Sequence, residues 1–232
     1  IARHNRRPQS STSELLARLT DEGLLYKDPV TREYAPTPRM ATMGIASQPE
    51  SIRNGRLVTY IDQLSRTTRK PVALLGTVGT HVQIFHCTSE REYGHDLGVS
   101  GIITGREELL TTSAAGQLLL TTLDPAQLQG RLWRLSSEAP TSAKFEIAEM
   151  RERIECARDM GHVSGPSGFV HNMQISAVLL QREALEPALA VGIFYPEALS
   201  QDADAYVSTL KHGISQILRP VDAAEGTINK PF

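Results

Sequence analysis

The amino-acid sequence predicts an α+β protein, with a small helix-and-hairpin unit at its front and a larger domain of antiparallel hairpins packed against helices. Two observations predict this class. Some segments place apolar residues at helical spacing, whereas others are short apolar runs that come in pairs around turn residues. Strand and helix patterns do not alternate regularly, so a parallel sheet is not expected. The 232 residues are enough for one large domain and a small companion.

The first predicted helix lies near the front of the chain and ends at Gly23. Leu15, Leu16 and Leu19 fall at helical spacing and are expected to form its buried stripe. Its start has two alternatives. Ser11 and Glu14 match a capping box, whereas Pro8 would fit as the first helical residue because its missing N–H costs nothing there.

A short β-hairpin is predicted next. Leu24–Tyr26 would form the first strand, Asp28-Pro29 would lie in the turn, and Arg32–Tyr34 would form the second strand. A helix, a glycine stop and a basic-tipped hairpin are together typical of the back half of a winged helix-turn-helix. We therefore predict a partial winged helix over residues 1–36, followed by a linker helix over 37–48.

Residues 49–220 are predicted to form the larger domain, with a tail at 221–232. Its first helix carries an apolar stripe, Ile52, Leu57, Ile61 and Leu64. The first elements expected are a helix over 50–67, a hairpin over 71–88 that turns at Val78-Gly79, and turns around a short strand over 94–105. Three helices follow, over 113–123, starting at Asp124, and over 142–160. The last elements expected are strands over Met173–Leu180 and Ala188–Tyr195 and a helix over 202–218.

The composition is that of an ordinary globular protein, with 40% hydrophobic and 22% charged residues. No apolar run approaches the roughly 18 residues of a membrane-spanning helix, and the first residues show no signal-peptide pattern. Cys87 and Cys156 lie far apart, which favours inert, partly buried thiols over a disulfide or a reactive thiol. We predict a cytoplasmic protein without membrane contact.

Charge is distributed unevenly along the chain. Residues 1–39 carry seven Lys/Arg against five Asp/Glu, a net charge of +2, whereas the whole chain carries −2, so the remainder carries −4. A basic front on an acidic body is typical of a nucleic-acid-reading unit attached to a soluble domain. A difference of this size also arises by chance, so it only directs attention to the front.

Patterns typical of enzymes and metal sites are absent from the sequence. The seven histidines show no HExxH or paired spacing. There is no G-x-S-x-G elbow, and the GPSG of residues 165–168 is interpreted as a turn. His86 and Cys87 are neighbours on a predicted strand, so their side chains would point to opposite faces. We therefore expect no enzyme activity, no metal and no cofactor.

Two segments carry a family resemblance. Residues 8–39, PQSSTSELLARLTDEGLLYKDPVTREYAPTPR, resemble the recognition helix and wing of the IclR (isocitrate lyase regulator) family of bacterial transcriptional regulators. Residues 111–128, TTSAAGQLLLTTLDPAQL, are similar to a helix of that family's effector domain. The likeness runs nearly the whole length in the same order. The shared features at the front are Pro8, Ser11 with Thr12, Leu15 with Leu16, Gly23, and Arg32 with Tyr34.

The resemblance implies a sequence-specific regulator, either repressor or activator, that binds double-stranded operator DNA. It implies a GAF-like antiparallel-sheet domain that binds a small organic effector, and assembly as a homodimer or homotetramer. It also implies that the winged helix is truncated here, because the family has a first helix and most of a second before the recognition helix, and only seven residues precede Pro8.

DNA reading requires hydrogen-bonding side chains at base edges and cations or hydroxyls at phosphates. The alternative for the same residues is a solvated helix face and a polar turn; the resemblance favours DNA. The candidates are Gln9, Ser10, Thr12 and Ser13 for the major groove, Arg6 and Arg7 before the helix, Arg18 further along it, and Lys27, Arg32 and Thr31 in the wing.

The resemblance places effector contacts at the start of the 113–123 helix, whose backbone amides would favour a ligand carboxylate. Gln117 stands where the family usually has lysine, and the strand positions that often carry an acid, a cysteine or serines are apolar here, which implies a more apolar pocket. The alternative is that small residues only let this helix pack closely on the sheet. The candidates are Ser113, Ala114, Ala115 and Gly116 on the helix, and Gly165, Ile175, Gly192 and Phe194 on the strands.

Two other function classes remain beside the ligand-responsive regulator. One is a small-molecule sensor or assembly module without direct DNA reading. The other is a small hydrolase on an α+β scaffold, which no motif favours. The operator, the ligand and the direction of regulation do not follow from the sequence.

Overall fold

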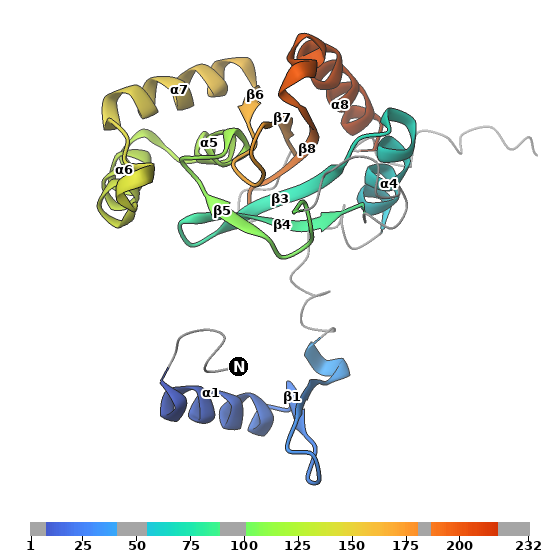
Figure 1. Ribbon diagram of the computed structural model, residues 1–232, viewed down its shortest axis with the longest axis vertical. Helices are drawn as coiled ribbons and strands as arrows, with labels where there is room; N and C mark the ends of the chain where they lie inside the picture. The colour runs from blue at the N-terminus through green and yellow to red at the C-terminus, as the bar shows by residue number, and fades with distance from the viewer. Residues whose placement is uncertain (1–7, 41–54, 89–100, 181–186, 218–232) are drawn as a thin grey trace, which may run out of the picture. The chain divides into compact units, whose positions relative to one another are not determined.

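A computed structural model describes residues 8–40, 55–88, 101–180 and 187–217 (Figure 1). The chain divides into two compact units, residues 1–54 and 55–232, called unit 1 and unit 2 here. Most of the predicted linker helix, together with the predicted tail, lies outside the described residues, although residues 38–40 are helical.

Unit 1 begins with helix α1, Gln9–Asp21, which starts directly after Pro8. The predicted capping box is wrong. Ser11 already lies inside the first turn, and the helix is instead started by the extended Pro8, whose carbonyl oxygen accepts from the Thr12 backbone N–H at 3.1 Å and from its hydroxyl at 2.9 Å. The helix ends as predicted, because Gly23 has a φ of +70°.

The predicted buried stripe on α1 is also wrong. No residue of α1 is buried; Leu15 is 57% exposed, and Leu16 and Leu19 are half-buried. In the described part of unit 1, α1 packs against strand β1, and one helix with one short hairpin cannot enclose a helix face.

The predicted hairpin is present but shifted toward the carboxyl end. Strands β1, Leu25–Lys27, and β2, Tyr34–Pro36, pair antiparallel with Lys27 opposite Tyr34. The connection between the strands spans residues 28–33. The Asp28 carboxylate accepts from the backbone N–H groups of Val30 at 2.7 Å and Thr31 at 2.8 Å, which organises the connection.

In unit 2 the described strands form one six-stranded antiparallel sheet in the order β5-β4-β3-β8-β7-β6 (Figure 1). The predicted hairpin at 71–88 and the two late strands are confirmed. The strands are β3 Val72–Val78, β4 His81–Cys87, β5 Glu107–Leu109, β6 His162–Pro166, β7 Met173–Leu179 and β8 Leu189–Pro196.

Two strand predictions need correction. The short strand expected within 94–105 lies at β5 instead, after turns at Gly101 and Gly105, and residues 89–100 lie outside the described part. The GPSG segment is not wholly a turn, because its Gly165 and Pro166 end strand β6. Proline fits there because β6 is an edge strand of the sheet.

Helices cover both faces of this sheet (Figure 1). Helices α4, Arg56–Thr68, and α8, Ala203–Ile217, pack on one face, and α5, Ala114–Leu120, packs on the other with α7, Ile147–Met160, against it. Helix α6, Pro125–Glu138, packs on α7 and begins as predicted, with the Asp124 carboxylate accepting from the Gln127 backbone N–H at 2.8 Å.

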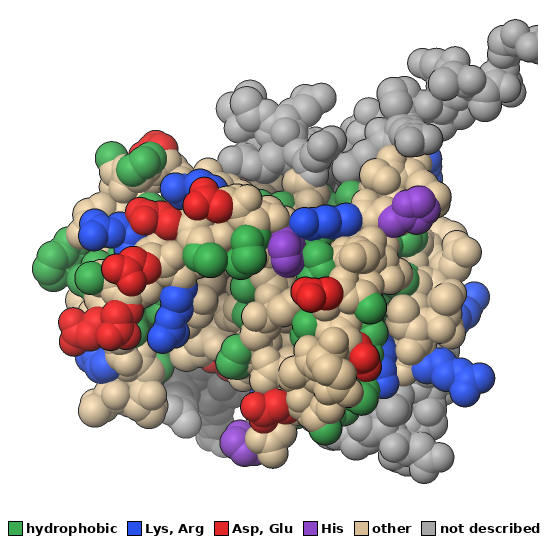
Figure 2. Space-filling model, turned by 90° about the horizontal axis from the view of Figure 1, so that it is seen from above, with side chains coloured by type: hydrophobic (Ala, Val, Ile, Leu, Met, Phe, Trp, Pro, Cys, Tyr) green, Lys and Arg blue, Asp and Glu red, His purple; other side chains and the backbone are tan. Residues whose placement is uncertain are grey.

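Helix α7 starts five residues later than the expected start at residue 142, because Pro140 and Lys144 are extended and residues Thr141–Ala143 form only one 3-10 turn. Its acidic and basic side chains are mostly exposed, and Figure 2 shows both signs interspersed over this part of the surface. The charged side chains of α7 therefore form a solvated helix face.

The core of unit 2 has one layer on each side of the sheet. On the α5 side, alternate strand residues such as Leu75, Ile175 and Phe194 pack with α5 in one hydrophobic cluster. On the other side, Tyr195 packs on Tyr206 of α8 with ring centroids 4.8 Å apart. The predicted stripe of α4 is buried at Leu57, Ile61 and Leu64; Ile52 lies outside the described residues.

Neither cysteine is in a disulfide: Cys87 is buried and Cys156 is exposed, so the expectation of partial burial is wrong for Cys156. Within the described ranges, no helix is both long and apolar enough to cross a membrane. In the same ranges, no group of three or more His, Cys, Asp or Glu side chains is placed to hold a metal ion.

Candidate functional site

The polar start of α1 presents most of its predicted DNA-reading side chains to solvent. Gln9, Ser10 and Ser13 are exposed, and Gln9 and Ser13 share a face because they are four residues apart. Thr12 differs, because it is half-buried and its hydroxyl donates to the Pro8 carbonyl oxygen. Arg6 and Arg7 lie outside the described residues.

Arg18 is held only weakly by its own helix. Its Nη2 lies 3.4 Å from Oε1 of Glu14, and both side chains are more than two-thirds exposed. An exposed ion pair four residues apart contributes little to stability, about 0.3–0.5 kcal/mol. The guanidinium can therefore exchange Glu14 for a phosphate at small cost.

The hairpin carries the other predicted cations. Lys27 places its ammonium 5.3 Å from the centre of the Tyr34 ring, which orders the lysine chain across the strand pair. Arg32 sits in the connection between the strands with a φ of +61°, a left-handed conformation that arginine rarely adopts. Thr31 is exposed beside it, and its hydroxyl oxygen accepts from the Glu33 backbone N–H at 3.3 Å.

The hairpin connection is expected to open at acid pH. The backbone N–H groups of Thr31 and Val30 hold the pKa of the Asp28 carboxyl below its usual value of 3.8. Because the folded pKa is lowered, the ionised carboxylate stabilises the turn above about pH 4, and this stabilisation is lost as the pH falls through the folded pKa. Amide chemical shifts of Val30 and Thr31 should therefore titrate together with a midpoint below the usual 3.8, and a midpoint at or above that value would contradict this.

The predicted effector residues come together on one face of the sheet in unit 2. Helix α5 packs on β6, β7, β8 and β3, and Ile175 pairs with Phe194 across β7 and β8. Ala114 approaches Gly165, where an added Cβ would lie 3.3 Å from the Ala114 Cβ. Ser113 precedes α5 and is fully buried, and its hydroxyl has no hydrogen-bond partner within the described part of the chain.

Close packing explains two glycines of this set, Gly116 and Gly192. A Cβ on Gly116 would lie 2.3 Å from the carbonyl oxygen of Leu110, and one on Gly192 would lie 2.5 Å from Cδ1 of Ile175. Phe194 meets Phe169 edge to face with ring centroids 6.0 Å apart. Together with Ala114 and Ala115, these apolar side chains belong to the hydrophobic core of unit 2.

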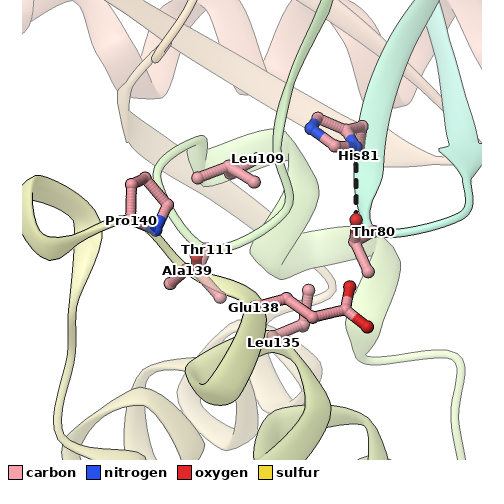
Figure 3. Close-up of a pocket in the computed structure, with 8 residues that line it drawn as sticks. All are labelled: Thr80, His81, Leu109, Thr111, Leu135, Glu138, Ala139 and Pro140. Atoms are coloured by element: carbon pink, nitrogen blue, oxygen red, sulfur yellow. Dashed lines mark hydrogen bonds between the residues drawn. The ribbon is translucent and has the colours of Figure 1, made fainter. Parts of the chain in front are cut away.

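Sequence reasoning missed a cavity of about 430 Å³ on this unit (Figure 3). Its polar lining residues come from the turn between β3 and β4, from the segment after β5 and from the end of α6, so no local motif joins them. The lining residues are Thr80, His81, Leu109, Thr111, Leu135, Glu138, Ala139 and Pro140.

No protein-family model matches this sequence, and no curated protein is similar to it. Solved structures do match. An IclR transcriptional regulator from Alicyclobacillus acidocaldarius superimposes with a TM-score of 0.68 at 17% identity, covering 93% of this chain and 86% of that one. The chain has the IclR fold.

Further structures with the IclR fold agree. An IclR homologue from Microbacterium hydrocarbonoxydans, in complex with 4-hydroxybenzoate, gives a TM-score of 0.66 at 16% identity, covering 93% of this chain and 87% of that chain. The IclR of Thermotoga maritima gives 0.60 at 14% identity, with the same two coverages. At these identities the similarity establishes the fold.

Proposed function

We propose that this protein is a DNA-binding transcriptional regulator of the IclR family whose sheet domain binds a small organic effector. One observation carries the proposal: the IclR fold extends over both units, and unit 1 displays an exposed polar helix start beside a hairpin with cations. The first unit would read DNA, and the second would sense the ligand.

In this proposal α1 enters the major groove with its amino-terminal half. Gln9, Ser10 and Ser13 would meet base edges, because amides and hydroxyls both donate and accept hydrogen bonds there. Cations further from the groove would neutralise phosphates. Those cations are Arg18 on α1, Lys27 and Arg32 on the hairpin, and Arg6 and Arg7 before the helix.

Fluorescence anisotropy of the full-length protein with DNA from upstream of its own gene tests this proposal. Binding is expected to be sequence-dependent, with log Kd rising steeply as salt increases. The variants Arg18→Ala and Arg32→Gly should each lower the salt slope by about one unit, because each removes one phosphate contact. Glycine is chosen at position 32 because it adopts the positive φ without strain.

The matched control is Arg153→Ala, which removes an exposed cation from α7 of unit 2 and should leave the salt slope unchanged. Equal, weak binding to scrambled DNA would contradict the DNA-reading role. It would favour the alternative of a sensor or assembly module without direct DNA reading.

The effector is proposed to contact the start of α5. The 4-hydroxybenzoate complex of a structural neighbour supports a small organic ligand for this fold. In this chain the buried Ser113 hydroxyl would gain the partner that it lacks, and Ile175 and Phe194 would contact the apolar body of the ligand. Since Ile175 already fills the space beside Gly192, binding would require core side chains to move.

Substituting Ser113 separates a packing role from a ligand role. Ser113→Ala should raise the free energy of unfolding by about 1 kcal/mol without ligand, because it removes a buried hydroxyl without a partner. Ser65→Ala is the matched control: Ser65 is equally buried, but its hydroxyl donates to the Lys70 carbonyl oxygen at 2.6 Å, so about 1 kcal/mol should be lost. Urea unfolding followed by circular dichroism measures both. A destabilising Ser113→Ala would show that the hydroxyl has a partner in solution.

A homodimer or homotetramer is part of the proposal, because two-fold symmetric regulators match palindromic operators. Light scattering coupled to size exclusion would give the mass directly, and a mass of one chain, 25.4 kDa, at micromolar concentration would contradict it.

A further inference from the structure

The cavity found in unit 2 shares no residue with the proposed effector site. Its walls are the β3–β4 turn, β5 with the residues after it, and the end of α6 (Figure 3). Leu109, Leu135, Ala139 and Pro140 supply an apolar surface. Its volume of about 430 Å³ falls in the range of roughly 300–1,000 Å³ that small-molecule sites occupy.

Thr111 gives this cavity a polar group without a partner. The residue is only 7% exposed, yet within the described residues its hydroxyl makes no hydrogen bond, and only its carbonyl oxygen is used, by the Gln117 side chain at 3.0 Å. The hydroxyl is open to the cavity, where a ligand could bond to it.

The other polar lining groups can all accept hydrogen bonds. Thr80 Oγ1 and His81 Nδ1 lie 3.2 Å apart and bond to each other (Figure 3). Among the described residues, the Glu138 carboxylate accepts a hydrogen bond only at Oε1, from Nε of Arg134 at 2.7 Å, and its side chain is 47% exposed. Its second oxygen remains open to a ligand.

We propose that this cavity binds a small protonated amine with an apolar body. Among the described lining residues there is a carboxylate and no lysine or arginine; Arg134 occupies one oxygen of that carboxylate, and an ammonium could bond to the other, which a carboxylate ligand could not do. The ammonium would donate to the open oxygen of Glu138, and the Thr111 hydroxyl would face the other end of the ligand (Figure 3). The apolar body would lie against Leu109 and Leu135.

Two probes of equal size and opposite charge test this proposal. Phenethylamine and 3-phenylpropionate both carry a phenyl ring on a two-carbon chain. Titrated into the ¹⁵N-labelled full-length protein, phenethylamine should shift the amides of Thr80, Thr111 and Glu138 with a Kd on the order of 1 mM. Phenylpropionate should bind at least tenfold more weakly.

Two variants locate the interaction. Glu138→Gln should weaken phenethylamine binding about tenfold, because a charged acceptor is replaced by a neutral one, and it should still fold because Glu138 is exposed at the surface. Thr111→Val should also weaken it, with the preference for the amine kept. Glu152→Gln, on the exposed face of α7, is the control and should leave the affinity unchanged.

Three outcomes would overturn the proposal. They are equal affinity for the two probes, unchanged affinity in Glu138→Gln, and amide shifts that map outside the cavity or do not appear at about 20 mM amine.

Discussion

Gly116→Ala is expected to lower the free energy of unfolding of unit 2 by about 3 kcal/mol. The added Cβ would lie 2.3 Å from the carbonyl oxygen and 2.6 Å from the Cα of Leu110, and neither backbone atom can rotate away. Helix α5 would have to move off the segment after β5, and its contacts with five strands of the sheet would loosen with it.

The same substitution at Gly130 is the control. Gly130 lies in α6, where an added Cβ would meet nothing within 4 Å, so Gly130→Ala should stabilise the protein by roughly 0.5–1 kcal/mol through helix propensity. Urea denaturation of the two variants against the parent measures the difference. A Gly116→Ala variant as stable as the parent would show that α5 is not seated on Leu110 in solution.

Phe194→Ala is expected to cost about 3–4 kcal/mol of unfolding free energy. Phe194 is fully buried in β8, where its ring contacts Phe169 edge to face and packs in the core beneath α5. Removing the ring would leave a cavity that the surrounding sheet cannot close, and the cost rises with the volume that remains.

Phe85→Ala is the matched comparison, because the same ring is lost from a side chain that is 38% exposed. It should cost less than half as much, since part of its surface already contacts water. A cost below about 1 kcal/mol for Phe194→Ala would mean that its ring is not a packing element and is free to serve a ligand. The loss of unfolding free energy in Phe194→Ala therefore measures how much this predicted effector residue contributes to the core.

The elements with strong local signals were predictable from the sequence. Asp124 before a proline predicts the start of α6, and Val78-Gly79 predicts the turn between β3 and β4. Strands β7 and β8 are apolar runs between polar connections. These signals act through hydrogen bonds and side-chain periods that span only a few residues, so the chain itself carries them.

Strand β6 shows where local signals fail. Its sequence, HVSGP, contains serine, glycine and proline, and its last two residues begin a GPSG segment that is typical of a turn. It becomes a strand because β7 offers a partner along its length, with Gly165 opposite Ile175, and because an edge position tolerates the proline. A pairing partner ten residues away is not visible in the five residues themselves.

By itself, the sequence determined the α+β class, the order of most elements and the exposed polar start of α1, because periodicity and turn chemistry are local. Only the tertiary structure decided that Leu15 is exposed and that other residues occupy the space where a Cβ of Gly116 or Gly192 would lie. It also decided that Thr111 and Glu138 line one cavity. The physical reason is that burial and cavities depend on atoms brought together from distant parts of the chain, which no local pattern records.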